Sequence, residues 1–168
     1  MLLRFSENRK KELKMISRYC MLNSRETWKR FQMIQIDTEA EMGDPENCPL
    51  TGYNMKILTL NTHSLVEENS EEKLKWFVEG ILREKPDIIA LQEVNQTADE
   101  GWMDPQMLAG QYPVPGCMKI RKDNFAARCA HLLREAGLEC FWAWVPVKLG
   151  YGKFDEGVAV LSIGRKIR

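Results

Sequence analysis

The chain has 168 residues and a formal net charge of +0, from 24 basic and 24 acidic side chains, and this length suits one domain. We expect no membrane span and no secretory signal peptide, because apolar runs are short and the N-terminus is polar and charged. Five cysteines without metal-ligand spacing or an even framework predict reduced thiols in a cytoplasmic protein.

The first 54 residues differ in composition from the rest of the chain. Residues 1–30 carry nine Lys or Arg against three Glu, whereas residues 31–54 carry five acidic residues and no basic one. A basic arm can bind nucleic acid, but this one lacks a recognisable fold, and a linker containing Pro and Gly follows at 44–52. We therefore expect residues 1–54 to be a disordered extension or a mis-assigned start, and residues 55–168 to be the domain.

Two short apolar runs come next, and each ends on polar side chains. Lys56–Leu60 stops at Asn61, and Asp87–Leu91 stops at Gln92-Glu93. Near-continuous apolar runs of this length are typical of strands in a sheet that is covered on both faces.

A helix is predicted between these two strands, because apolar residues recur there along one helical face. These residues are Leu74, Phe77, Val78, Ile81 and Leu82. Ser70 is the expected N-cap, and Pro86 prevents the helix from continuing. A strand, a helix and a strand with short joints predict a βαβ unit whose strands are parallel.

Parallel strands place their carboxyl ends at one edge of a sheet, which is where open α/β folds bind ligands. This arrangement predicts that Asn61 and Glu93 lie side by side, with His63 just beyond them. Carboxylate and amide oxygens suit Mg²⁺ or Mn²⁺. The alternative interpretation is that Asn61 forms a turn and that Glu93 is a solvated strand end.

The two motifs together resemble a known family. LNTHS at 60–64, a helix, and DIIALQEVNQ at 87–96 resemble the opening of the endonuclease/exonuclease/phosphatase family, which includes DNase I-like nucleases. The resemblance implies that Asn61 and Glu93 line the metal site of a metal-dependent phosphoesterase. DEGVAVLS at 155–162 resembles one of the family's inner strands, so the resemblance extends from Met55 to the end of the chain.

The resemblance also implies the fold. We expect an α/β (α+β) structure that forms the first half of a four-layer αββα sandwich of the DNase I-like type. One sheet face would then be exposed, with Trp142 or Trp144 on it. Exposed apolar faces of this kind mark an interface or an aggregation liability, so association through this face is an expectation.

The segment Asn95–Lys122 is rich in turn residues and is expected to form a surface loop beside the catalytic edge. Trp102 and Tyr112 either stack on a substrate base or sugar, or anchor this loop to the domain. The loop is expected to contain substrate-selecting residues.

A second helix is predicted at Phe125–Ala136, with Asn124 as its N-cap. Asn124 is also a candidate for substrate binding, because the N–H groups at a helix N-terminus favour anions. His131 lies off the apolar stripe of this helix, so we expect it to be a surface residue without a catalytic role.

Leu138–Val145 is predicted to be a strand that Pro146 stops, and it is expected to pair antiparallel with a strand at Gly157–Ile163. Tyr151 lies in the loop between them. It is a second candidate for substrate binding, and the alternative is that it packs at the base of the loop.

The family resemblance implies hydrolysis of a phosphodiester or phosphomonoester by metal-activated water at Asn61 and Glu93. His63, just beyond Asn61, is the third catalytic candidate. The resemblance also implies an Asp/His pair as the general base. The family's Asp-x-Asn and terminal Ser-Asp-His motifs have no counterpart up to Arg168. We therefore expect a truncated enzyme that is inactive as given.

Two other functions remain open. A non-catalytic relative of the same fold would bind nucleic acid or a protein through the basic arm and the exposed sheet face. An unrelated doubly wound nucleotide-binding domain is disfavoured, because Asn61–Ser70 contains no glycine for a phosphate loop. Nucleic acid, phospholipid and sugar phosphate are all candidate substrates of the phosphoesterase.

Overall fold

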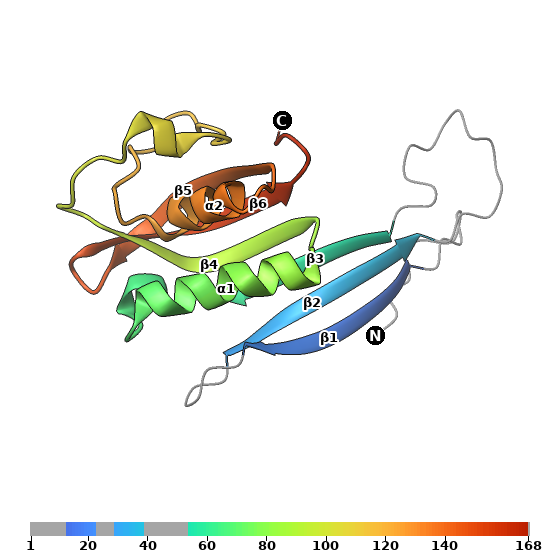
Figure 1. The fold of residues 1–168 in the computed structure, drawn as a ribbon. Coiled ribbons are helices and arrows are strands. Elements are labelled where there is room, and N and C mark those ends of the chain that lie inside the picture. The colour runs from blue at the N-terminus through green and yellow to red at the C-terminus, as the bar shows by residue number, and fades with distance from the viewer. Residues whose placement is uncertain (1–12, 23–28, 39–53, 168) are drawn as a thin grey trace, which may run out of the picture.

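A computed structural model describes residues 13–22, 29–38 and 54–167 (Figure 1). These residues form a six-stranded sheet in the order β1-β2-β3-β4-β6-β5. Strands β3 and β4 are parallel, and the other neighbours pair antiparallel. The strands are β1 (Leu13–Leu22), β2 (Lys29–Thr38), β3 (Asn54–Asn61), β4 (Ile88–Thr97), β5 (Cys140–Gly150) and β6 (Phe154–Ile163). The helices are η1 (Ser64–Val66), α1 (Ser70–Glu84), η2 (Pro105–Leu108) and α2 (Phe125–Glu135).

The βαβ unit expected from the sequence is confirmed as β3, α1 and β4. Residues 57–61 of β3 pair in parallel with residues 88–92 of β4. The expected N-cap was wrong by one residue, because Ser70 is already helical and Asn69 caps α1 with a φ of 57° and no side-chain cap bond. At the other end, Lys85 has a φ of 50° and precedes the helix-breaking Pro86.

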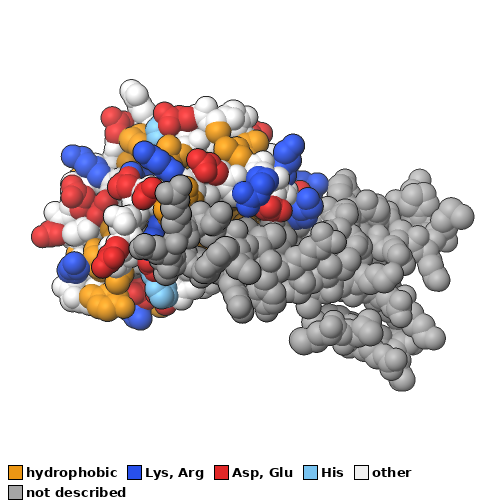
Figure 2. Space-filling view, turned by 60° about the horizontal axis from the view of Figure 1, so that its bottom comes forward, with side chains coloured by type: hydrophobic (Ala, Val, Ile, Leu, Met, Phe, Trp, Pro, Cys, Tyr) orange, Lys and Arg blue, Asp and Glu red, His pale blue; other side chains and the backbone are white. Residues whose placement is uncertain are grey.

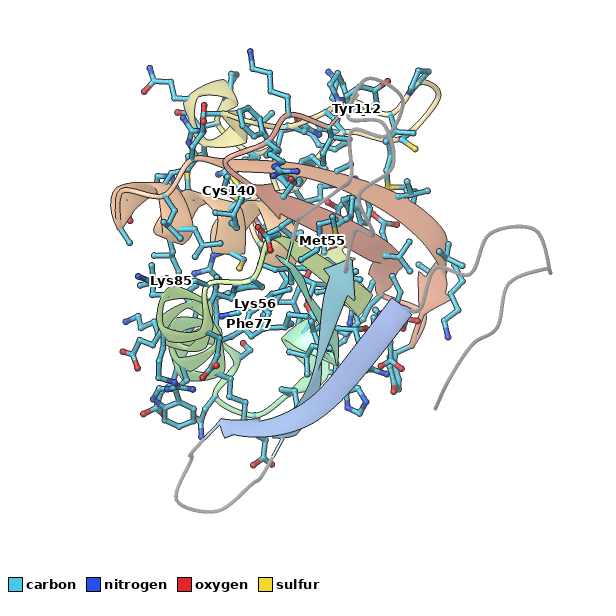
Figure 3. All side chains as sticks on the ribbon, turned by 90° about the vertical axis from the view of Figure 1, so that its right-hand side faces the viewer. Met55, Lys56, Phe77, Lys85, Tyr112 and Cys140 are labelled. Atoms are coloured by element: carbon cyan, nitrogen blue, oxygen red, sulfur yellow. The ribbon has the colours of Figure 1, made fainter. Side chains whose placement is uncertain are left out.

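The two α-helices cover one face of the sheet, and the core lies between them and four of the strands (Figure 1). The strand residues buried there are Leu58, Leu60, Ile89, Leu91, Trp142, Trp144, Ala159 and Leu161. The ring centroids of Phe77 from α1 and Phe125 from α2 lie 6.3 Å apart. In Figure 3, Phe77 and Lys56 lie where α1 meets the sheet, and Lys56 Nζ donates to the carbonyl of Glu84 at 3.3 Å.

The opposite face of the sheet is partly exposed. Val145 of β5 and Val158 of β6 are cross-strand partners there, and both side chains are exposed. The expectation that Trp142 or Trp144 lies on the exposed face is wrong, because they are 0% and 2% exposed in the core. Side chains alternate along a strand, and this register directs both tryptophans toward the helices and Val145 away from them.

Strand β5 is longer than the sequence predicted. Pro146 was expected to stop it after Val145, but the strand continues to Gly150, with a register shift against β6 between Pro146 and Lys148. Since β5 is the last strand in the sheet order, a proline there interrupts fewer ladder hydrogen bonds than it would in a central strand. The antiparallel pairing of β5 with β6 is as predicted.

Part of the N-terminal segment forms strands. Strand β2 pairs antiparallel with β3, at residues 32–37 and 54–59, and β1 pairs with β2. These two strands differ from the disorder expected for residues 1–54, because β2 satisfies the edge of β3 that β4 leaves open. Residues 1–12, 23–28 and 39–53 lie outside the described residues, and the domain boundary at Met55 stays a prediction. None of the described helices has the length and apolar composition that crossing a membrane needs.

Candidate active site

Asn61 and Glu93 meet at the carboxyl ends of the parallel pairing, as the sequence predicted. Asn61 is the last residue of β3, and its Nδ2 donates a hydrogen bond of 2.7 Å to Glu93 Oε1. The Oδ1 atom of Asn61 accepts a bond of 3.2 Å from the backbone N–H of His63. The side chain of Glu93 remains 37% exposed, so a carboxylate fixed by an amide faces solvent.

Glu93 does not end its strand, which differs from the sequence prediction. Strand β4 continues to Thr97, and its register against β6 shifts between Leu91 and Val94. Glu93 itself has a φ of 53°. Because a non-glycine residue in this left-handed region costs about 1–3 kcal/mol, its surroundings must hold the conformation. The carboxylate is therefore presented by a β-bulge within a central strand.

The loop after β3 holds this bulge. The backbone N–H of Thr62 donates to the Gln92 carbonyl at 2.9 Å, and its Oγ1 lies 3.0 Å and 2.9 Å from the carbonyls of Gln92 and Glu93. Ser64 Oγ accepts a bond of 3.1 Å from the backbone N–H of Asn95. Thr62 and Ser64 are both buried, so the contacts are shielded from water.

His63 is also at this site and belongs to a row of charged and polar groups. Its Nε2 lies 3.6 Å from Glu93 Oε2, and its Nδ1 lies 3.2 Å from Glu67 Oε1. Glu67 in turn accepts from Lys73 Nζ at 2.5 Å. The sequence analysis missed Glu67 and Lys73. For Glu67, the only indication in the sequence was its position four residues after His63.

Lys148, from the hairpin of β5 and β6, adds positive charge near Glu93. Lys148 Nζ lies 3.1 Å from Glu156 Oε1. The hydrogen bond to Glu156 raises the pKa of Lys148, and the negative charges of Glu156 and Glu93 act in the same direction. Tyr151 is exposed in the turn between β5 and β6, with a φ of 52°. Substrate binding by Tyr151 stays a prediction.

Asn124 caps α2, as the sequence predicted. Its Oδ1 accepts from the backbone N–H of Ala127 at 3.0 Å, and its Nδ2 donates to Gln96 Oε1 at 3.0 Å. The side chain is fully buried, and these protein partners use both of its polar atoms. Substrate binding by Asn124 also stays a prediction. His131 lies on α2 with its Nε2 3.4 Å from Glu135 Oε1.

No protein-family model matches the sequence, and no curated protein matches it. A solved structure does: it is an endonuclease/exonuclease/phosphatase family protein from Leptotrichia buccalis C-1013-b, with a TM-score of 0.52 and 33% identity. The match covers 64% of this chain and 36% of that protein. This similarity supports a relation to the endonuclease/exonuclease/phosphatase family. The mixed α/β fold of the chain is consistent with part of a DNase I-like fold, and the chain spans about a third of its relative's length.

The family resemblance implies a divalent cation, and the side chains at the bulge fit a weakly held one. Glu93 supplies a partly exposed carboxylate, and Asn61 supplies an amide oxygen, which accepts from the backbone N–H of His63 while the amide nitrogen faces Glu93. Mg²⁺ commonly takes one or two carboxylates and completes its shell with water and substrate phosphate. Within residues 13–22, 29–38 and 54–167, no cluster of three or more His, Cys, Asp or Glu is placed to hold a metal. The few side-chain donors therefore fit a cation whose coordination shell is completed mainly by water.

Proposed function

We propose that this chain carries the N-terminal part of a phosphoesterase site, in which Glu93 and Asn61 hold Mg²⁺ or Mn²⁺. The observation that supports this most is the 2.7 Å hydrogen bond from Asn61 Nδ2 to Glu93 Oε1 on the bulge of β4. The 33% identity to a structure of the same family supports the reaction class. A four-layer sandwich of the DNase I-like type is also part of this proposal.

The proposed reaction is hydrolysis of a phosphodiester or phosphomonoester by in-line attack of water, during which negative charge grows on the phosphate oxygens. A divalent cation, when bound, supplies neutralising charge and lowers the pKa of water. Asn61 fixes the orientation of the Glu93 carboxylate through Oε1. His63 faces Oε2 of the same carboxylate at 3.6 Å. Lys148 adds a positive charge that a phosphate can approach, because its side chain is 64% exposed.

Proton abstraction from the attacking water needs a general base. The family resemblance implies an Asp/His pair, but His63 and His131 are the two histidines of this sequence. Among the described residues, His63 with Glu67 is the carboxylate–imidazole pair beside Glu93. We propose that residues 1–168 lack the family's base and turn over little substrate, since a missing acid–base group costs about 10² to 10⁴ in rate.

The test is hydrolysis of bis(p-nitrophenyl) phosphate with Mg²⁺ or Mn²⁺. Residues 1–168 and the full reading frame of the gene are compared. We expect turnover by the full reading frame, lost by about 100-fold or more in Glu93→Gln with an unchanged thermal transition. Glu135→Gln, on the exposed surface of α2, is the matched control and should keep activity.

Two results would change the proposal. Loss of folding in Glu93→Gln would assign this residue a structural role. Turnover by residues 1–168 that disappears in His63→Asn would identify His63 as the base and contradict the expected inactivity.

A non-catalytic relative that binds nucleic acid or a protein is the second candidate. It is favoured by the small donor set, because the described residues offer no cluster of three metal-ligating groups. On the face drawn in Figure 2, acidic and basic side chains are intermixed over the described residues, which gives no preference for nucleic acid. Absence of both Mn²⁺ binding and hydrolysis in the full reading frame would favour this candidate. The substrate class and a cytoplasmic location remain proposals.

A further inference from the structure

The carbonyl groups of Gln92 and Glu93 converge on one residue, Thr62. Its hydroxyl lies 3.0 Å from the first carbonyl oxygen and 2.9 Å from the second. Its backbone N–H binds the Gln92 carbonyl as well, at 2.9 Å. A hydroxyl carries one proton, so the two carbonyls share a single donor in a three-centre bond.

This convergence reports the conformation of the bulge. Along a regular strand, successive carbonyls point in opposite directions, so one hydroxyl cannot reach both of them. The φ of 53° at Glu93 and the register shift after Leu91 remove this alternation. The Thr62 hydroxyl can therefore be satisfied in this way only while Glu93 is in its left-handed conformation.

Thr62 is well placed to impose that conformation. It is 4% exposed, so water competes little for the two carbonyls. It directly follows Asn61, the residue whose amide binds the Glu93 carboxylate at 2.7 Å. Two consecutive residues thus hold Glu93: the Thr62 hydroxyl binds its backbone carbonyl, and the Asn61 amide binds its side-chain carboxylate.

We propose that Thr62 is a positioning residue for Glu93, which its hydroxyl holds in the left-handed bulge so that the carboxylate faces Asn61 and the cation. This inference rests on the proposed function for the cation, but the geometry of Glu93 can be tested without metal. Neighbouring hydroxyls act elsewhere: Thr59 Oγ1 accepts from the Gln92 side chain at 3.1 Å, and Ser64 Oγ accepts from the backbone N–H of Asn95.

The first measurement uses NMR of the full-length protein without metal. The side-chain amide protons of Asn61 report its bond to Glu93, and Glu93→Gly gives the reference without a carboxylate. We expect Thr62→Val to lose the exchange protection of these protons, down to the reference level. Thr62→Ser should keep the protection. Thr59→Val is the matched control, because it removes a hydroxyl that binds the side chain of Gln92 and no bulge carbonyl; it should keep the protection too.

Folding is followed by the indole N–H signal of Trp144, which donates to the Val94 carbonyl at 3.0 Å. Thr62→Ala is made in parallel, in case the valine does not fit. Wild-type protection of the Asn61 amide in a folded Thr62→Val or Thr62→Ala overturns the proposal. Failure of both variants to fold also overturns it, since the hydroxyl would then serve global stability.

The second measurement is Mn²⁺ titration, followed by paramagnetic broadening of the His63 ring signals, with His131 as the internal reference. We expect Thr62→Val to weaken Mn²⁺ binding by about 10-fold to 100-fold, the usual effect of losing a group that supports a ligand. Thr62→Ser should restore the affinity. If the wild-type protein binds no Mn²⁺, the proposed function fails while the Asn61 signals still decide the role of Thr62. If Mn²⁺ binding is equal in wild type and Thr62→Val, the positioning role is wrong.

Discussion

Left-handed backbone conformations gather at the candidate active site. Among the described residues, six that are not glycine have a positive φ, and three of these are His63, Ser64 and Glu93. Such conformations are unfavourable for ordinary side chains, and they persist where surrounding contacts hold them. The contacts from Thr62 and Asn95 supply that support here. The backbone strain at the site is thus balanced by buried hydrogen bonds.

The φ of 46° at His63 gives a prediction for stability. Asparagine adopts the left-handed region more readily than most residues, whereas a β-branched residue is a genuine outlier there. We expect His63→Asn to fold with nearly wild-type stability, and His63→Val to lose about 1–3 kcal/mol. Urea unfolding of both variants measures the difference. The same pair at His131, which lies in α2, is the control and should differ by only a few tenths of a kcal/mol. Equal stability of the two His63 variants would contradict the left-handed conformation.

At the scale of single residues, the sequence predicted that Asn61 and Glu93 lie together, but it did not predict the contacts of Thr62 and Lys148 around them. The meeting of Asn61 and Glu93 follows from the parallel pairing of two strands, which hydrophobic patterns reveal. The contacts of Thr62 depend on a bulge with a left-handed residue, and no glycine marks it in the sequence. The approach of Lys148 depends on the register between β5 and β6 after a second bulge, which single-sequence patterns do not specify.

The helices are joined at their surface by an ion pair between Glu71 of α1 and Arg128 of α2. The two terminal guanidinium nitrogens of Arg128, Nη1 and Nη2, donate to the Glu71 carboxylate oxygens Oε1 and Oε2. The hydrogen bond from Arg128 lowers the pKa of Glu71 below its ordinary value, against the opposing effect of burial. The same pair raises the pKa of Arg128. Bidentate pairing of this kind gives a fixed geometry between two elements that the chain separates widely.

The lowered pKa of Glu71 predicts a pH dependence. A carboxyl group with a lowered pKa in the folded state adds stability at pH values above its unfolded pKa, and this stability is lost as the pH falls through the folded pKa. We expect Glu71→Gln to be less stable than wild type at pH 7 and to lose less stability on acidification below 4.5. The effect is small, since the Glu71 side chain is 61% exposed, and added salt should weaken it.

Thermal unfolding at pH 7 and at pH 3, in low and high salt, measures this difference. Glu72→Gln is the matched control, because it removes a charge from the same helical turn and keeps the pair of Glu71 with Arg128. Parallel pH profiles for Glu71→Gln and wild type would show that the pair does not form in solution.

At the scale of elements, sequence patterns predicted β3, α1, β4, α2 and the pairing of β5 with β6. Their boundaries were less predictable for physical reasons. Strand β4 continues beyond Gln92 and Glu93 because a bulge accommodates these polar residues. Strand β5 continues beyond Pro146 because it lies at the edge of the sheet, where a missing N–H donor is tolerated. Strands β1 and β2 were missed, because β2 takes its place in the sheet by pairing with β3 and β1 by pairing with β2, and such pairings are not visible in local propensity.

The whole molecule has one helix-covered sheet face and one that is partly exposed. Its main cluster of buried apolar residues joins both α-helices to the strands from β3 onward. Two cysteines belong to this cluster, Cys129 on α2 and Cys140 at the start of β5, whereas Cys117 lies outside the core in a loop. These three thiols are free, and their burial differs. The reactivity of these thiols can therefore show whether the two α-helices remain packed on the sheet, whose opposite face is partly exposed to solvent.

Burial raises the pKa of both core thiols, that of Cys129 well above its ordinary value and that of Cys140 to about 12. At pH 8 they are neutral, unreactive and inaccessible, because the thiolate is the nucleophile. We expect iodoacetamide to label Cys117 in the native protein and to spare Cys129 and Cys140, as measured by peptide mass spectrometry. In 8 M urea all three should react, which is the control for reagent and peptide recovery. If Cys129 and Cys140 were labelled without urea as fast as Cys117, the helices would have to separate from the sheet in the native protein. That result would indicate that a sheet with one face in water does not keep its core closed.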